Sequence, residues 1–165
     1  MTAPQTHSWL PDQLSLNDFN GMADLEIAAY AVFQQDWSRS SVFRGDEVRV
    51  HRHPHKANPD RWHTYWHAVT EGHPEETRTT PMQDRLERSP WILPLVENEE
   101  EVKVWSNIRG RDRHICIWMD RKNYLVILKK CKNHYLLKTA YCPESRRRQQ
   151  LHREYANWKK TGCAL

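Results

Sequence analysis

The sequence has no long hydrophobic run. No apolar stretch approaches the ~20 residues that a membrane-spanning helix needs. The opening residues, MTAPQTHSWLPDQ, contain no basic stretch followed by an apolar core, which predicts that no secretory signal is present. Internal repeats and low-complexity segments are also missing. We therefore expect a soluble protein that acts without a membrane.

Cysteine is scarce, and its spacing excludes the common cysteine frameworks. The four cysteines are Cys116, Cys131, Cys142 and Cys163. None forms a C-x-x-C pair, and three lie inside or beside apolar strand-like runs. This pattern favours buried free thiols over a zinc site or a disulfide framework. Together with the missing signal, it predicts a location in the reducing cytoplasm.

The composition is that of a folded protein with a highly charged surface. The chain has 165 residues, of which 38% are hydrophobic and 28% charged, and its eight Trp, six Tyr and three Phe argue against disorder. This length suits one domain. We expect residues 1–14, which have two prolines and no periodicity, to form a flexible arm, and residues 15–165 to form a single α+β domain.

Charge is distributed unevenly along the chain. The formal net charge is only +4, but acidic residues concentrate at 97–101 and basic residues dominate from Lys103 to Lys160. The basic part includes the run Arg146-Arg147-Arg148. Such asymmetry is typical of proteins with a polyanionic partner such as a nucleic acid. A solvated basic face without a partner is the alternative.

Hydrophobic periodicity in the first hundred residues indicates helices more clearly than strands. The predicted elements are a helix within 18–37, a short strand at 43–50, a loop at 51–60, a strand at 62–70, a helix from Thr80 through Arg88 and an irregular core segment at 91–96. Thr80-Pro81-Met82-Gln83 is a favourable helix start, and Pro90 limits the helix that follows.

The remainder of the chain shows the clearest pattern. Four runs, at 101–107, 113–119, 124–131 and 134–142, are separated by short polar turns, which predicts an antiparallel meander. A helix is expected from Pro143 to about Lys160, with Gly162 just beyond its end. Leu151, Tyr155 and Trp158 form one apolar stripe on this helix. The predicted fold is α+β: N-terminal helices, then a four-stranded antiparallel sheet, then a C-terminal helix.

Histidines are concentrated between residues 51 and 67. His51, His53 and His55 alternate, and His63 and His67 follow closely, so a metal site is conceivable. Pro54 argues against a regular strand, however, and no spaced carboxylate or cysteine completes a familiar ligand set. We therefore interpret His51, His53 and His55 as surface residues on a loop and assign no metal.

His67 lies in the largely apolar run 62–69. On the predicted strand it would share one face with His63 and Tyr65. An imidazole there is either a satisfied core group or a general acid or base, because it titrates near neutral pH.

Arg85 and Arg88 lie three residues apart and are neighbours on the predicted helix. They either pair with the nearby carboxylates Asp84 and Glu87 or form a guanidinium fork on a phosphate.

The last predicted strand combines polar and apolar residues. Alternation would place Tyr135, Leu137, Thr139 and Tyr141 on one face, where Thr139 and Tyr141 would meet Lys129 of the preceding strand. Tyrosine can stack on a base, and threonine can bind a phosphate oxygen. Ordinary residues at the edge of the core are the alternative.

The segment Leu136-Leu137-Lys138-Thr139-Ala140-Tyr141-Cys142-Pro143 resembles the end of a late strand in the barnase–EndoU–colicin D–RelE superfamily of toxin ribonucleases, including its phage branches. The resemblance covers about residues 45–160. It implies that His67 is the general acid or base, that Arg85 or Arg88 holds the scissile phosphate, and that Thr139 and Tyr141 line the same cleft. His63, Tyr65, Arg146 and Arg147 are the expected substrate-binding residues.

The resemblance implies a metal-independent endoribonuclease without a cofactor, in which the ribose 2′-hydroxyl attacks phosphorus and leaves a 2′,3′-cyclic phosphate. Lys129 and the arginines would stabilise the charge on the phosphoryl oxygens. Its partners would be RNA and an acidic antitoxin or immunity protein. The alternatives are a non-catalytic nucleic-acid-binding domain, a protein-interaction module and a metal hydrolase that uses the histidines.

Overall fold

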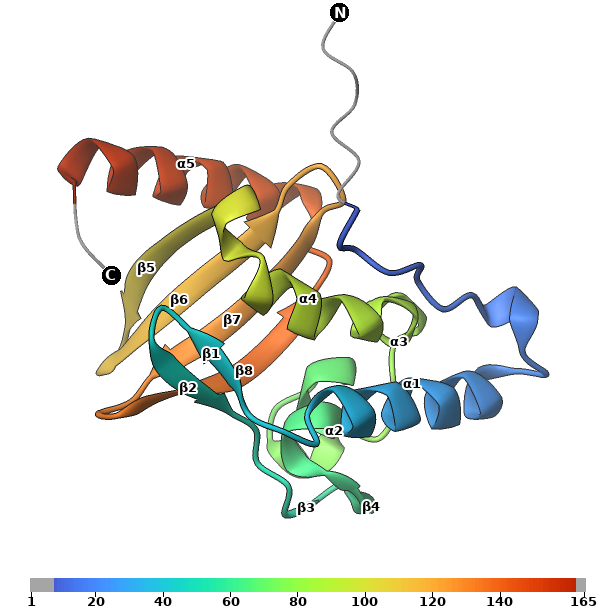
Figure 1. Ribbon diagram of the computed structural model, residues 1–165. Helices are drawn as coiled ribbons and strands as arrows, with labels where there is room; N and C mark the ends of the chain where they lie inside the picture. Colours follow the sequence, from blue (N-terminus) through green and yellow to red (C-terminus); the bar gives the residue numbers. More distant parts are fainter. Residues whose placement is uncertain (1–7, 163–165) are drawn as a thin grey trace, which may run out of the picture.

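A six-stranded mixed sheet organises the computed structural model, which describes residues 8–162 (Figure 1). Its strand order is β1-β2-β8-β7-β6-β5. The strands are β1 (Ser41–Phe43), β2 (Asp46–Arg49), β5 (Lys103–Arg109), β6 (Asp112–Met119), β7 (Tyr124–Lys130) and β8 (His134–Tyr141). Since helices cover this sheet, the predicted α+β class is confirmed.

The antiparallel meander is confirmed, but the sheet is larger than the predicted four strands. β5, β6, β7 and β8 pair consecutively in antiparallel register. A hairpin of β1 and β2, which turns at Arg44 and Gly45 with φ values of 49° and 89°, extends the sheet because β2 pairs in parallel with β8. This pairing joins segments more than eighty residues apart (Glu47 with His134), so local patterns could not predict it.

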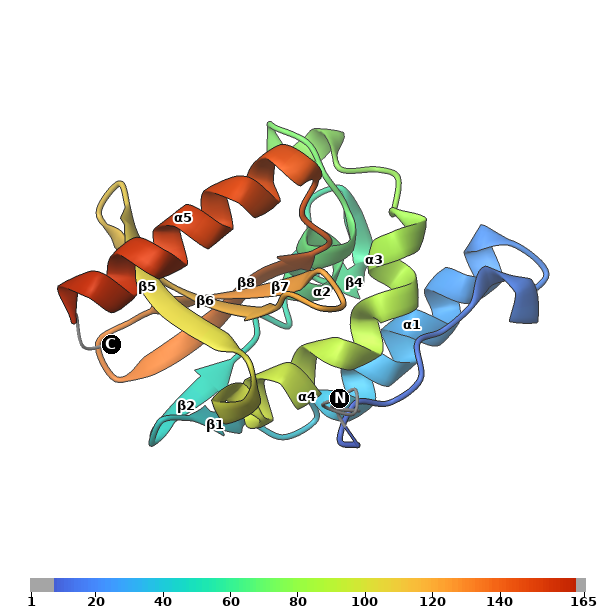
Figure 2. The ribbon, with the colours of Figure 1, turned by 90° about the horizontal axis from the view of Figure 1, so that it is seen from above.

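The two faces of the sheet carry separate cores. One face packs against α1 (Met22–Asp36), α2 (His63–Val69), α3 (Gln83–Arg88) and α4 (Ile92–Glu97), and the residues buried between them form the larger core. The other packs against α5 (Ser145–Thr161), on the opposite side of the sheet in Figure 2. Leu151 is fully buried there, with Tyr155 and Trp158 beside it, so the predicted apolar stripe is confirmed.

Three segments differ from the sequence-based expectation. Residues 63–69 form the helix α2 rather than a strand, and its residues Tyr65, Trp66 and Val69 enter the core together. The expected loop at 51–60 contains a two-stranded ribbon, β3 (Pro54–His55) and β4 (Asn58–Trp62). The expected irregular segment becomes α4, because Pro94 falls in its first turn, where a missing N–H breaks no helical hydrogen bond.

The described part of the expected arm lies against the helices. Trp9, Leu10 and Leu14 pack on the larger core. The Leu14 amide donates to the Glu87 carbonyl at 2.8 Å, and the Trp91 indole donates to the Pro11 carbonyl at 2.8 Å. Residues 1–7 of this segment lie outside the described residues.

The cysteines of the described residues carry free thiols. Cys116 is buried, and burial raises its pKa to about 12, while Cys131 and Cys142 are partly buried. Cys163 lies outside the described residues. Within residues 8–162, no helix has the length and apolarity required to cross a membrane.

Asp36 at the end of α1 is expected to oppose folding at neutral pH. Burial, followed by repulsion from Glu97, raises its pKa from 3.8 to about 6. Between pH 4 and pH 6 the unfolded chain releases the Asp36 proton and the folded chain retains it. The stability of the protonated, neutral form is therefore fully present below pH 4 and is lost as the pH rises through 6, where the buried carboxyl group becomes charged. The full shift corresponds to ~3 kcal/mol, which solvent screening of a half-buried carboxylate reduces to about 1 kcal/mol.

Asp36→Asn should therefore stabilise the protein by about 1 kcal/mol at pH 7.5 and have no such effect at pH 3.5. Urea denaturation at the two pH values measures this difference. Asp24→Asn, in the first turn of the same helix, is the matched control and should slightly destabilise the protein because it removes a negative charge from the helix N-terminus. An Asp36→Asn effect independent of pH would contradict this account.

Candidate functional site

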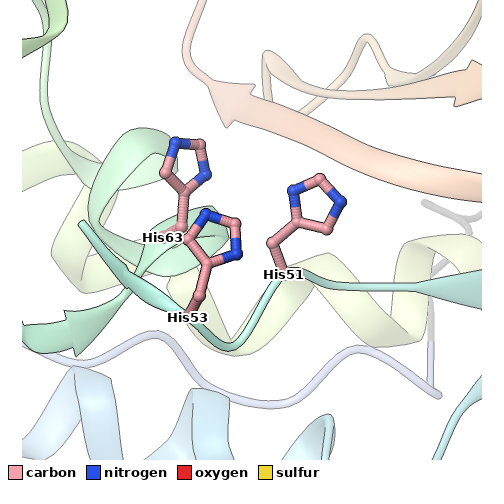
Figure 3. Close-up of side chains that lie close together, drawn as sticks. All are labelled: His51, His53 and His63. Carbon is pink, nitrogen blue, oxygen red and sulfur yellow. The ribbon is translucent and has the colours of Figure 1, made fainter. Parts of the chain in front are cut away.

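Five of the chain's ten histidines form one contiguous cluster, with His63 at its centre. The ring centroid of His63 lies 4.8 Å from that of His53, 5.0 Å from His55, 5.9 Å from His67 and 6.0 Å from His51. His51 and His53 are exposed, His63 and His67 are half-buried, and His55 is buried. Solutes can therefore reach the cluster from the side of His51 and His53, which Figure 3 shows facing His63.

Backbone hydrogen bonds bring the two histidine-bearing segments together. The first N–H groups of a helix have no partner within that helix. Here the His63 amide donates to the His53 carbonyl at 2.8 Å, and the Thr64 amide donates to the His51 carbonyl at 3.2 Å. In return, the His51 amide donates to the Thr64 hydroxyl oxygen at 2.8 Å. The segment that carries His51 and His53 thus caps the helix that carries His63.

The helical form of α2 changes which residues share a face. His63 and His67 are four residues apart, so they lie one turn above each other on the same side of the helix, and their rings stack with an interplanar angle of 15°. Tyr65 instead points into the larger core, where its hydroxyl donates to a Glu26 carboxylate oxygen at 2.9 Å. The predicted strand face of His63, Tyr65 and His67 is wrong for this reason.

Glu75 supplies a carboxylate that the sequence analysis did not identify. One of its oxygens contacts Nε2 of His63 and lies 3.5 Å from Nε2 of His55. Nδ1 of His55 accepts the Ala57 amide at 2.9 Å, which places the proton of a neutral His55 ring on Nε2, facing Glu75. No sequence signal marks Glu75, because it belongs to a separate short 3-10 helix (Glu75–Thr77).

Burial and neighbouring positive charges lower the pKa of three of these histidines, His51, His55 and His67. Burial lowers the pKa of His67 to about 4, with further lowering by Arg78, His63 and Lys138. The pKa of His51 and that of His55 are also lowered, chiefly by burial. Nδ1 of His67 is buried and has no hydrogen-bond partner among the described residues. Neutral imidazoles can accept a proton or bind a metal ion.

Two sets of side chains have the spacing of potential metal ligands. The first is His51, His53 and His63, and the second is His55, His63 and Glu75. Within each set, one ligand atom per residue lies within 4.8 Å of the others. The expectation of surface histidines on a loop holds for His51 and His53, whereas His55 is buried in β3, and all three belong to one cluster with His63 and His67.

Lys138 lies near the cluster because of an irregularity in β8. Ile127 pairs with Thr139 and the next residue, Leu128, pairs with Leu137, so Lys138 is an extra residue in the strand. Such bulges redirect side chains and are common beside active sites. The positive charge of Lys138 contributes to lowering the pKa of both His51 and His67.

The same bulge breaks the predicted alternation along β8. Tyr135 and Leu137 belong to the larger core, as does Ala140, whereas Tyr141 packs with the core beneath α5. Tyr135, Leu137, Thr139 and Tyr141 therefore do not share one face, because the extra residue reverses the order of inward and outward side chains.

Arg85 and Arg78 bind the C-terminal end of α2. Nη1 of Arg85 donates to the carbonyls of Ala68 and Thr70 at 3.2 and 3.0 Å, and its Nη2 pairs with Glu71 at 2.6 Å. Nη1 of Arg78 donates to the carbonyls of His67 and Thr70 at 2.8 and 2.7 Å. Both arginines thus satisfy carbonyl groups that a helix end leaves unpaired.

The other predicted site residues are distributed over several surfaces. Arg88 lies over the Trp91 ring, and Lys129 pairs with Asp112 at 3.4 Å. Tyr141 lies beneath the Arg85 guanidinium, and its hydroxyl accepts a hydrogen bond from Arg147 at 3.4 Å. Thr139 is half-buried, and Arg146 is exposed on α5. Of the predicted residues, only His63 and His67 belong to the histidine cluster.

The fold and site define an α+β protein with an imidazole cluster on a helix that packs against strand β8. No family model, no curated protein and no solved structure matches the chain. Its function must therefore be argued from the site.

Proposed function

We propose that the protein is a metal-independent endoribonuclease whose active site is the histidine cluster. The observation that carries the proposal is the packing of α2 along β8. α2 carries His63 and His67, and the charge of Lys138 on β8 contributes to lowering the pKa of His67. Lys138 directly precedes the Thr139-Ala140-Tyr141 sequence. The helix with the acid–base candidates thus packs against the strand that resembles those of the toxin ribonucleases, which supports the proposal.

Cleavage of RNA to a 2′,3′-cyclic phosphate needs one group that accepts the 2′-hydroxyl proton and one that protonates the leaving 5′-oxygen. His63 and His67 supply this pair from one face of α2. Glu75 contacts Nε2 of His63 and thereby orients the ring, as a carboxylate does for histidine in other acid–base sites.

Cations near the imidazoles would stabilise the negative charge that develops on the phosphate in the transition state. Lys138 supplies a positive charge beside His67. A preorganised donor of this kind contributes ~3–4 kcal/mol where charge develops on phosphoryl oxygens. The exposed basic residues of α5, Arg146, Arg148, Arg153, Lys159 and Lys160, offer further phosphate contacts for a long RNA.

An RNA substrate and free cysteine thiols suit a cytoplasmic protein. A nuclease of this kind needs an inhibitor in the cell that makes it, and we propose an acidic antitoxin or immunity protein that covers the basic surface.

Purified protein incubated with total cellular RNA in excess EDTA should produce fragments that end in 2′,3′-cyclic phosphate. His152→Ala, which changes an exposed histidine on α5, is a control expected to cleave normally. Intact RNA together with a salt-sensitive gel shift would overturn the enzyme proposal and identify a non-catalytic RNA-binding protein.

A further inference from the structure

We propose that His51, His53 and His63 form a binding site for a divalent transition-metal ion, best suited to Zn²⁺, with Glu75 orienting His63. The three rings come from two segments and face one another (Figure 3). Nε2 of His63 contacts Glu75, which leaves Nδ1 of the same ring for the metal.

The distances are compatible with binding after a small rearrangement. The three ligand nitrogens lie within 4.8 Å of one another. Tetrahedral zinc, with Zn–N bonds of ~2.0–2.1 Å, requires nitrogens about 3.3 Å apart. His51 and His53 are exposed, so rotation of their side chains can close the difference without disturbing the core.

The backbone that holds these rings is already in place. The carbonyls of His51 and His53 accept the first two amides of α2, so the ligand-bearing segments cannot separate without loss of these hydrogen bonds. Glu75 completes a carboxylate–histidine–metal arrangement, in which the carboxylate fixes the ring and raises its basicity.

The donor set selects the class of metal. Three imidazoles and no directly bound carboxylate favour Zn²⁺, Cu²⁺ or Ni²⁺ over Mg²⁺ and Ca²⁺, which prefer oxygen. Three protein ligands on the exposed side of the cluster leave a fourth position for water.

The site also predicts a means of regulation, and this step rests on the proposed function. A metal ion on Nδ1 of His63 removes that ring from proton transfer, so Zn²⁺ should inhibit RNA cleavage and EDTA should restore it.

The test is isothermal titration of Zn²⁺ into protein without a polyhistidine tag, with visible absorption of bound Co²⁺ as a second readout of tetrahedral coordination. One equivalent should bind. We expect His51→Ala and His53→Ala to weaken binding at least ~10-fold and Glu75→Gln to weaken it ~10–100-fold. His152→Ala, the matched control, should bind normally.

Binding that survives both His51→Ala and His53→Ala would overturn this assignment, as it would point to the alternative set of His55, His63 and Glu75. Absence of binding to the unmodified protein would also overturn it. Neither result bears on the nuclease, because titration without RNA tests the metal site alone and cleavage in EDTA tests the nuclease alone.

Discussion

His67→Ala is expected to lower the rate of RNA cleavage by ~100–10,000-fold, the usual contribution of a general acid or base. His67 lies one turn from His63 on α2, and the pKa of about 4 keeps its ring neutral at pH 7. The change removes no hydrogen bond of the ring, because Nδ1 has no partner among the described residues. The His67→Ala protein should therefore keep its fold.

Single-turnover cleavage of a short labelled RNA in EDTA measures this effect, and thermal unfolding of the same preparation reports the fold. Two further variants serve for comparison. His152→Ala should cleave normally, and His63→Ala should lose about as much activity as His67→Ala. Full activity of a folded His67→Ala protein would remove His67 from the site.

Arg85→Ala is expected to lower the free energy of unfolding by about 3 kcal/mol, since hydrogen bonds to charged groups contribute ~1.5–3 kcal/mol each. Its guanidinium group is buried and binds the carbonyls of Ala68 and Thr70, which would be left without this donor. Urea denaturation at pH 7.5 measures the change.

Arg88→Ala is the matched control on the same helix. The Arg88 side chain is only partly buried, donates to the Asp84 carbonyl at 3.1 Å and lies over the Trp91 ring, so we expect a loss below about 1 kcal/mol. If Arg85→Ala left stability unchanged and abolished cleavage, Arg85 would hold the phosphate, as the family resemblance implies, rather than the end of α2.

Local patterns predicted the C-terminal half of the fold. Alternating apolar residues and short polar turns were sufficient for β5 to β8, and the spacing of Leu151, Tyr155 and Trp158 was sufficient for the docked face of α5. These features depend on residues close in the chain, so the sequence by itself determined them.

Tertiary structure decided the rest. The aromatic and β-branched content of residues 63–69 predicts a strand, yet these residues form a helix. The N-terminal amides of this helix donate to the carbonyls of His51 and His53, and its C-terminal carbonyls accept from Arg78 and Arg85. The histidine cluster depends on these contacts of α2, the Glu75 contact joins α2 to a separate short helix, and the parallel pairing of β2 with β8 joins segments more than eighty residues apart. The sequence alone placed histidines near one another in the chain, and only the capping of α2 by the backbone carbonyls of His51 and His53 gathered their rings into one cluster.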